Sequence, residues 1–168
     1  MKARTLILLR HAKSSWKQPV PDHDRPLSGR GQRDAPAVGR LLRERGMKPD
    51  LVLCSPAVRT RQTWQLVHGA GVEASEVRFV PEIYGGRAED LRQVLRTVPE
   101  GTGTVLLIGH APGLPDLADS LAGPDRSPAA ARMRGKFPTA GLALFAVTAP
   151  WAELERAELL DFQVPRAR

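Results

Sequence analysis

The sequence lacks the features that mark secreted, membrane-spanning and nucleic-acid-binding proteins. Its 168 residues include a single cysteine, Cys54, so no internal disulfide can form, which favours a reducing compartment. The longest apolar run near the N-terminus covers residues 6–9 and is too short for a signal-peptide core or a membrane span. Aromatic residues make up 5% of the chain and form no interleaved platform for bases. We therefore expect a cytoplasmic protein that binds neither membranes nor nucleic acids.

The rest of the composition is that of an ordinary globular domain. The chain is 42% hydrophobic and 26% charged, and its length suits one domain over residues 1–168. No repeat of 20 to 50 residues is present, which excludes solenoids. No G-x-x-x-x-G-K-[ST] motif is present either, so nucleoside triphosphate chemistry lacks support. The sequence does not indicate an oligomeric state.

The net charge of +7 comes entirely from the first half of the chain. Residues 1–84 hold 15 Lys and Arg against 8 Asp and Glu, whereas residues 85–168 hold 10 of each sign. Clustered guanidinium groups would attract anionic ligands such as phosphates. A compositional bias toward arginine would give the same excess without any function, and both interpretations stay open.

Short apolar runs alternate with amphipathic stretches along the chain. We expect helices at residues 28–45 with the N-cap included, 57–67, 88–98 and 113–121, and strands at residues 6–10, 51–54, 77–80, 104–108, 142–147 and 158–162. Residues 123–137 are predicted to form a basic surface loop, with a short helix at 129–133. The alternation predicts an α/β fold, in which a mainly parallel sheet of about six strands carries helices on both faces.

Polar residues gather where three of these strands end. Arg10 and His11 follow the first strand, Ser55 and Arg59 follow the second, and His110 follows the fourth. In open α/β sheets, ligands bind at the carboxyl ends of the parallel strands. We therefore expect two histidines and two arginines to converge at one edge of the sheet.

This combination of residues favours phosphate chemistry. Pro56 and Pro112 each fall where the first residue of a helix is expected, so two helix N-termini would face the site. Neighbouring arginine charges disfavour a protonated His11, which leaves a ring nitrogen able to attack phosphorus. His110 would donate a hydrogen bond to the phosphoryl oxygens as charge accumulates on them. A structural role for the histidines is the alternative at this point.

Six segments resemble the histidine phosphatase, or phosphoglycerate mutase-like, superfamily. LLRHAKSSW at 8–16 is similar to its Arg-His-Gly signature, with Ala12 in place of the glycine. SPAVRTRQT at 55–63 and LLIGHAPGLPDLA at 106–118 are similar to its second-arginine and second-histidine segments. Further segments resemble the SixA-type phosphohistidine phosphatase branch, namely DRPLSGRG at 24–31, FPTAGLALF at 137–145 and DFQVPR at 161–166.

The resemblance implies a fold and a set of roles. The fold would be a three-layer α/β/α sandwich around a mainly parallel six-stranded sheet with one antiparallel strand. His11 would be the phosphorylated nucleophile, and Arg10, Arg59 and His110 would form the phosphate pocket. We expect no metal and no cofactor, and the implied partner is a protein that carries phosphohistidine.

Several positions depart from the pattern of the superfamily or are assigned to supporting roles. Lys13 and Lys17 stand where the superfamily usually has Glu and Asn. We assign Ser14 and Lys17 to substrate binding, Lys17 as a charge and not as an amide. Glu82 is the candidate proton donor, although its spacing to Tyr84 is one residue shorter than in the mutases. A plain surface carboxylate is the alternative for Glu82.

Two other constellations are set aside. A cysteine phosphatase built on Cys54 would need arginine at position 60, where the chain has Thr60. The adjacent residues Asp22, His23 and Asp24 could suggest a metal site, but three neighbours in a proline-flanked loop do not easily converge on one ion. We expect a solvated loop there.

The predicted function is a metal-independent phosphatase that works through a phosphohistidine intermediate and removes phosphate from phosphohistidine on a partner protein. Without a lid insertion, the pocket should be shallow, with Lys13, Lys17 and residues 123–137 at its rim. The first alternative is a broad-specificity small-molecule phosphomonoesterase of the same superfamily. A non-catalytic phosphoprotein-binding module is the second, and turnover of a generic aryl phosphate would exclude it.

Overall fold

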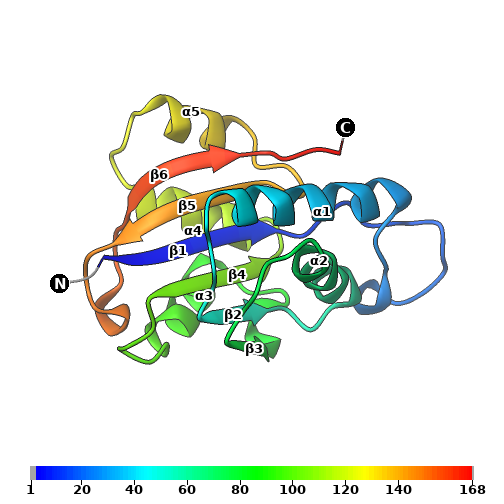
Figure 1. Ribbon diagram of the computed structural model, residues 1–168, viewed down its shortest axis with the longest axis horizontal. Coiled ribbons are helices and arrows are strands. Elements are labelled where there is room, and N and C mark those ends of the chain that lie inside the picture. The colour runs from blue at the N-terminus through cyan, green and yellow to red at the C-terminus, as the bar shows by residue number, and fades with distance from the viewer. Residues whose placement is uncertain (1–2, 168) are drawn as a thin grey trace.

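The computed structural model describes residues 3–167 and is built around one six-stranded sheet (Figure 1). The strands are β1 (Arg4–Arg10), β2 (Leu51–Cys54), β3 (Glu76–Phe79), β4 (Thr104–Gly109), β5 (Leu142–Val147) and β6 (Glu158–Gln163). Their order across the sheet is β3-β2-β4-β1-β5-β6. β1 to β4 are mutually parallel, and β5 runs antiparallel to both of its neighbours, β1 and β6. The predicted sheet with one antiparallel strand is confirmed.

Helices cover both faces of the sheet. They are α1 (Gly29–Glu44), α2 (Val58–Gly69), α3 (Ala88–Arg96), α4 (Gly113–Ala122) and α5 (Pro128–Gly135), with 3-10 turns η1 (Asp22–Asp24), η2 (Pro81–Ile83) and η3 (Trp151–Glu153). α1 and α2 lie on the side nearer the viewer in Figure 1, and α3 and α4 lie behind the sheet. The three-layer α/β/α sandwich is therefore confirmed.

The core divides at the sheet because the side chains of a strand alternate between its two faces. Along β1, Leu6 and Leu8 pack with residues of α3, α4 and α5, whereas Ile7 and Leu9 pack with residues of α1 and α2. A strand covered on both faces needs a continuous apolar run, which is the pattern from which β1 was predicted.

The strand register brings the candidate residues to one place. Arg10 pairs with Gly109 between β1 and β4, and Cys54 pairs with Ile108 between β2 and β4. Three strands therefore end level with one another. The residues that directly follow them, His11, Ser55 and His110, must lie close together.

The start of α2 and the basic loop differ from the prediction. α2 begins at Val58 and not at Pro56, because the Ala57 N–H donates to the Ser55 hydroxyl and forms a turn before the helix. α4 begins at Gly113 as the predicted range has it, and Pro112 is its N-cap and not its first helical residue. The basic loop contains a longer helix than expected, α5, because the Ser127 hydroxyl caps its first turn. Within residues 3–167, no helix is long and apolar enough to cross a bilayer.

Candidate active site

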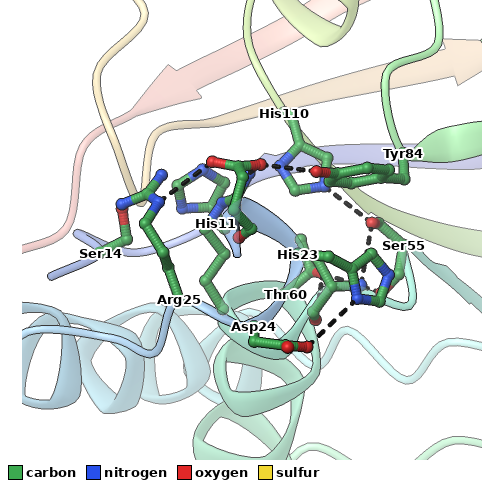
Figure 2. Close-up of polar contacts among 12 residues, drawn as sticks. His11, Ser14, His23, Asp24, Arg25, Ser55, Thr60, Tyr84 and His110 are labelled. Atoms are coloured by element: carbon green, nitrogen blue, oxygen red, sulfur yellow. Dashed lines mark hydrogen bonds and ion pairs between the residues drawn. The ribbon is translucent and has the colours of Figure 1, made fainter. Parts of the chain in front are cut away.

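Two histidine rings lie beside each other at the carboxyl edge of the sheet, with their planes tilted by 56°. The ring centroids of His11 and His110 are 5.2 Å apart, and Figure 2 shows the two rings beside each other. Arg59, in the first turn of α2, is buried next to them and contributes to the field at both rings. Arg10 ends β1, and its Nη1 donates to the carbonyl of Phe137 at 2.9 Å. The two histidines and two arginines converge as the sequence predicted.

One ring nitrogen of His11 makes a hydrogen bond, and the other has no hydrogen-bond partner within residues 3–167. Its Nδ1 lies 2.6 Å from the carbonyl oxygen of Ala12. A carbonyl only accepts hydrogen bonds, so Nδ1 carries the proton and Nε2 of the neutral ring keeps its lone pair. Burial lowers the pKa of His11 to about 3, with smaller contributions from the charges of Arg59 and Arg10. The ring is neutral as predicted, but burial is the main cause and not the arginines.

His110 is oriented by Ser55, a residue for which the sequence analysis predicted no role. Its Nε2 lies 2.7 Å from Oγ of Ser55, the residue that follows β2. Its Nδ1 is buried and has no hydrogen-bond partner in the described part of the chain. Burial, followed by the charge of Arg59, lowers the pKa of His110 to about 4. The signal that could have identified Ser55 is its place at a strand end, level with His11 and His110.

Unpaired buried nitrogens concentrate in this site. Within residues 3–167, four buried side-chain nitrogens lack a hydrogen-bond partner, and three of them are Arg10 Nε, Arg59 Nε and His110 Nδ1. Burying polar groups without partners is costly, and such groups in a native structure call for an explanation. Two guanidinium groups together with an imidazole suit an anion with several oxygens, such as a phosphoryl group.

Asp22 is the residue that the sequence interpretation missed. Its Oδ2 accepts from Tyr84 Oη at 2.6 Å and from Arg59 Nη2 at 3.1 Å, and its Oδ1 accepts from Arg25 Nε at 3.1 Å. Its backbone carbonyl accepts from Arg59 Nη1 at 2.7 Å. The hydrogen bond from Tyr84, followed by those from the two arginines, holds the pKa of Asp22 far below its usual range. Asp22 is exposed, as a solvated loop predicts, but its carboxylate also has hydrogen-bond partners that the sequence did not indicate.

The neighbours of Asp22 in η1 do not contact Arg59 within residues 3–167, although His23 packs edge-on against Tyr84 with ring centroids 4.8 Å apart. Asp24 lies beside His23, with 3.8 Å between Oδ1 and Nδ1, and Figure 2 shows both away from His11. Asp22 instead contacts Arg59. In the described residues, no group of three or more His, Cys, Asp or Glu side chains is arranged to hold a metal ion.

The remaining predicted residues lie outside the central group. Ser14 Oγ accepts from Arg25 Nη1 at 2.8 Å, so Ser14 is linked to the site through Arg25. Lys17 is exposed, and its side chain makes no hydrogen bond or ion pair within residues 3–167. Glu82 is exposed in η2 and lines a cavity of about 690 Å³ with Tyr84. The substrate-binding roles of Ser14 and Lys17 and the proton-donor role of Glu82 stay predictions.

Cys54 lies inside the core and close to the site in sequence. It is fully buried in β2, and burial raises the pKa of its thiol to about 12. A thiol with such a pKa is not ionised at neutral pH, and the thiolate is the reactive form. The geometry agrees with the exclusion of a cysteine nucleophile from the motif spacing.

The fold and this edge of the sheet define an α/β phosphatase that uses a histidine nucleophile. The sequence model of the histidine phosphatase superfamily (branch 1) matches residues 6–107. The chain therefore belongs to this superfamily.

Relatives and solved structures match nearly the whole chain. An uncharacterized protein of Mycobacterium tuberculosis is 40% identical over 163 residues, which cover 94% of this chain and 100% of that protein. The structure of "Putative Phosphohistidine Phosphatase SixA from Nakamurella multipartitia" is 36% identical, with a TM-score of 0.86 and 98% of both chains covered. A structure with the same description from Agrobacterium tumefaciens is 30% identical, with a TM-score of 0.80 and 96% of this chain and 99% of that chain covered. The predicted resemblance to the SixA type is confirmed.

Proposed function

We propose that this enzyme removes the phosphoryl group from phosphohistidine on a partner protein, without a metal ion, through a phosphorylated His11. The observation that carries the proposal is the state of His11. Its Nδ1 is tied to the Ala12 carbonyl, and its ring is neutral. A lone pair on Nε2 is therefore available for attack on phosphorus.

The proposed reaction has two steps. In the first, His11 Nε2 forms a bond to phosphorus while the P–N bond of the substrate breaks, and its electron pair leaves with the substrate imidazole. Arg10 and Arg59 neutralise the phosphoryl oxygens, and His110 donates a hydrogen bond from Nδ1 as negative charge accumulates on them. In the second step, water attacks the phosphorylated His11, releases inorganic phosphate and restores the neutral ring.

A protein substrate is supported by the surroundings of the site. Trp16 is 77% exposed and lies over the guanidinium of Arg25, with 3.4 Å from Cζ to the ring centroid. Lys13 and Lys17 are exposed on the same segment. A partner with acidic and apolar groups around its phosphohistidine would complement this rim. The basic residues of α5 contribute less, because Arg134 is paired with Asp119.

The test is a denaturing trap with phosphorus-labelled substrate. Wild-type protein should carry an acid-labile, base-stable label, and His11→Ala should carry none and lose turnover. His68→Ala, on the far turn of α2, is the matched control. Activity should persist in chelator, because the arginines supply the charge that a metal ion would otherwise bring.

The substrate class is tested by comparing kcat/KM on a phosphohistidine-bearing protein, phosphoglycerate and sugar phosphates. A higher value on the protein is expected. A clear preference for the small molecules would support the broad-specificity phosphomonoesterase instead. No turnover even of an aryl phosphate would leave only a binding module.

A further inference from the structure

Asp22 brings a negative charge into a site that is otherwise built to bind an anion. We infer that the Asp22 carboxylate recognises the protonated imidazole ring of a phosphohistidine substrate and so selects substrates whose leaving group already carries its proton. The inference rests on the proposed function and adds a specificity-determining residue to it.

The carboxylate is held firmly and is still accessible. Tyr84 and Arg59 both donate to Oδ2, which occupies that oxygen. Oδ1 accepts only from Arg25 among the described residues, and a carboxylate oxygen can accept two hydrogen bonds. The side chain of Asp22 is 48% exposed, so a substrate group can reach the remaining position on Oδ1.

The remaining acceptor position on Oδ1 of Asp22 lies next to the residues predicted to react with the substrate. Asp22 shares Arg59 with the predicted phosphate pocket, and Tyr84 packs edge-on against His110 with ring centroids 5.6 Å apart. A substrate whose phosphorus faces His11 must place its leaving group on the side away from the His11 ring. Asp22 belongs to η1 and reaches the pocket from the loop between β1 and α1, not from the sheet edge.

The chemistry of the leaving group explains why binding a protonated imidazole would favour the reaction. In phosphohistidine one imidazole nitrogen is bonded to phosphorus, and the other can bind a proton and make the ring a cation. When His11 Nε2 forms its bond to phosphorus, the P–N bond breaks and its electron pair stays on the departing nitrogen. The product is a neutral imidazole that keeps the proton on its other nitrogen, so no proton has to be supplied. An N–H on that nitrogen would donate to Oδ1 of Asp22.

Asp22 is unsuited to the alternative role of general acid. Its hydrogen bonds from Tyr84, Arg25 and Arg59 all favour the ionised carboxylate, which holds its pKa far below the usual range. An ionised group has no proton to give to an alkoxide. It would also repel an anionic leaving group such as a phenolate.

A purely structural role makes a different prediction. If Asp22 only positioned Arg59, its removal would lower activity on every phosphorylated substrate by a similar factor. If Asp22 recognises the imidazolium, its removal will lower activity on phosphoramidates of imidazole and raise activity on phosphate esters with anionic leaving groups. The ratio of the two activities therefore separates the roles.

The experiment compares Asp22→Asn with the wild type on N-phosphoimidazole and on p-nitrophenyl phosphate. The ratio of the two kcat/KM values should fall about tenfold or more, as expected when a close charge pair is lost. The value on p-nitrophenyl phosphate itself should rise. Asp24→Asn is the matched control, because it removes the same charge from the same turn without touching Arg59, and its ratio should stay at the wild-type value.

Two further variants keep a carboxylate at this place and so distinguish the loss of its charge from a folding defect. Asp22→Glu should keep part of the preference for N-phosphoimidazole, and Tyr84→Phe should keep most of it because the carboxylate remains. Equal losses on both substrates in Asp22→Asn, or an unchanged ratio, would overturn the inference while leaving the proposed function intact. A wild-type enzyme with no activity on any phosphohistidine substrate would instead overturn the proposed function.

Discussion

The rings of His11 and His110 lie with their centroids 5.2 Å apart, and both are neutral at physiological pH. Burial is the first cause in each case and lowers the pKa to about 3 for His11 and about 4 for His110, from the ordinary 6.5. Each ring therefore resists protonation in the folded state and accepts a proton readily in the unfolded state.

The first prediction concerns stability in acid. A pKa that is lower in the folded state costs stability as the pH falls below about 6.5, since the unfolded chain then binds protons that the folded chain does not. Between pH 7 and pH 5, each ring should lower the free energy of unfolding by about 2 kcal/mol. Urea denaturation at pH 7, 6 and 5 measures the loss, and His11→Asn should remove the part due to His11. Identical pH dependence in wild type and variant would contradict the neutral, buried state of this ring.

The second prediction concerns Arg59. Replacement with alanine should lower kcat/KM by on the order of 10²-fold or more, because a buried group that stabilises transition-state charge contributes several kcal/mol. Steady-state kinetics on an aryl phosphate measures this. Arg61→Ala, in the same helix but exposed, is the control. A loss of less than tenfold for Arg59→Ala would show that the phosphate pocket is misassigned.

The third prediction concerns Ser55 as a positioning residue. If His110 donates to the phosphoryl group from Nδ1, its Nε2 must accept from the Ser55 hydroxyl, which lies 2.7 Å away. Nitrogen NMR of labelled histidine should show His110 protonated at Nδ1. Ser55→Ala should disturb this tautomer and lower kcat about tenfold, less than the roughly 10²-fold or more that loss of a general acid or base costs, because the His110 ring itself remains. Ser15→Ala serves as control. Protonation at Nε2 in the wild type would exclude this arrangement.

The fourth prediction tests whether Glu82 protonates the leaving group of a phosphoimidazole substrate. A general acid contributes roughly 10²-fold to 10⁴-fold, so Glu82→Gln would cause a loss of that size if Glu82 protonated the leaving group. Glu82 is exposed and lines a cavity whose wall includes none of His11, Arg10, Arg59 and His110. We expect less than about a threefold change in kcat/KM on N-phosphoimidazole, on which a proton donor is not needed. A hundredfold loss there would establish Glu82 as the donor and weaken the case for Asp22.

The sequence predicts the fold and the meeting of Arg10, His11, Arg59 and His110 at one edge of the sheet, and the roles of these four residues stay predictions. Continuous apolar runs specify strands that are covered on both faces, as in β1, and residues at the ends of parallel strands must meet at one edge. Arg10, His11 and His110 lie at or directly after such ends, and Arg59 follows β2 by five residues in α2, so they converge once β2, β4 and β1 are neighbours in the sheet. The start of α2 was less predictable, because a hydrogen bond from the Ala57 N–H to the Ser55 hydroxyl forms a turn before the first helical residue.

Only the tertiary structure placed Asp22, Tyr84 and Ser55. In the sequence, Asp22 is separated from Arg59 by 37 positions and from Tyr84 by 62, and Ser55 is separated from His110 by 55. No local sequence pattern indicates such pairs. They depend on how the loop between β1 and α1 folds over the sheet edge and on the register that places the ends of β2 and β4 side by side. Periodicity and caps report on neighbours a few residues apart, whereas the partner of a loop carboxylate is decided by the packing of the whole molecule.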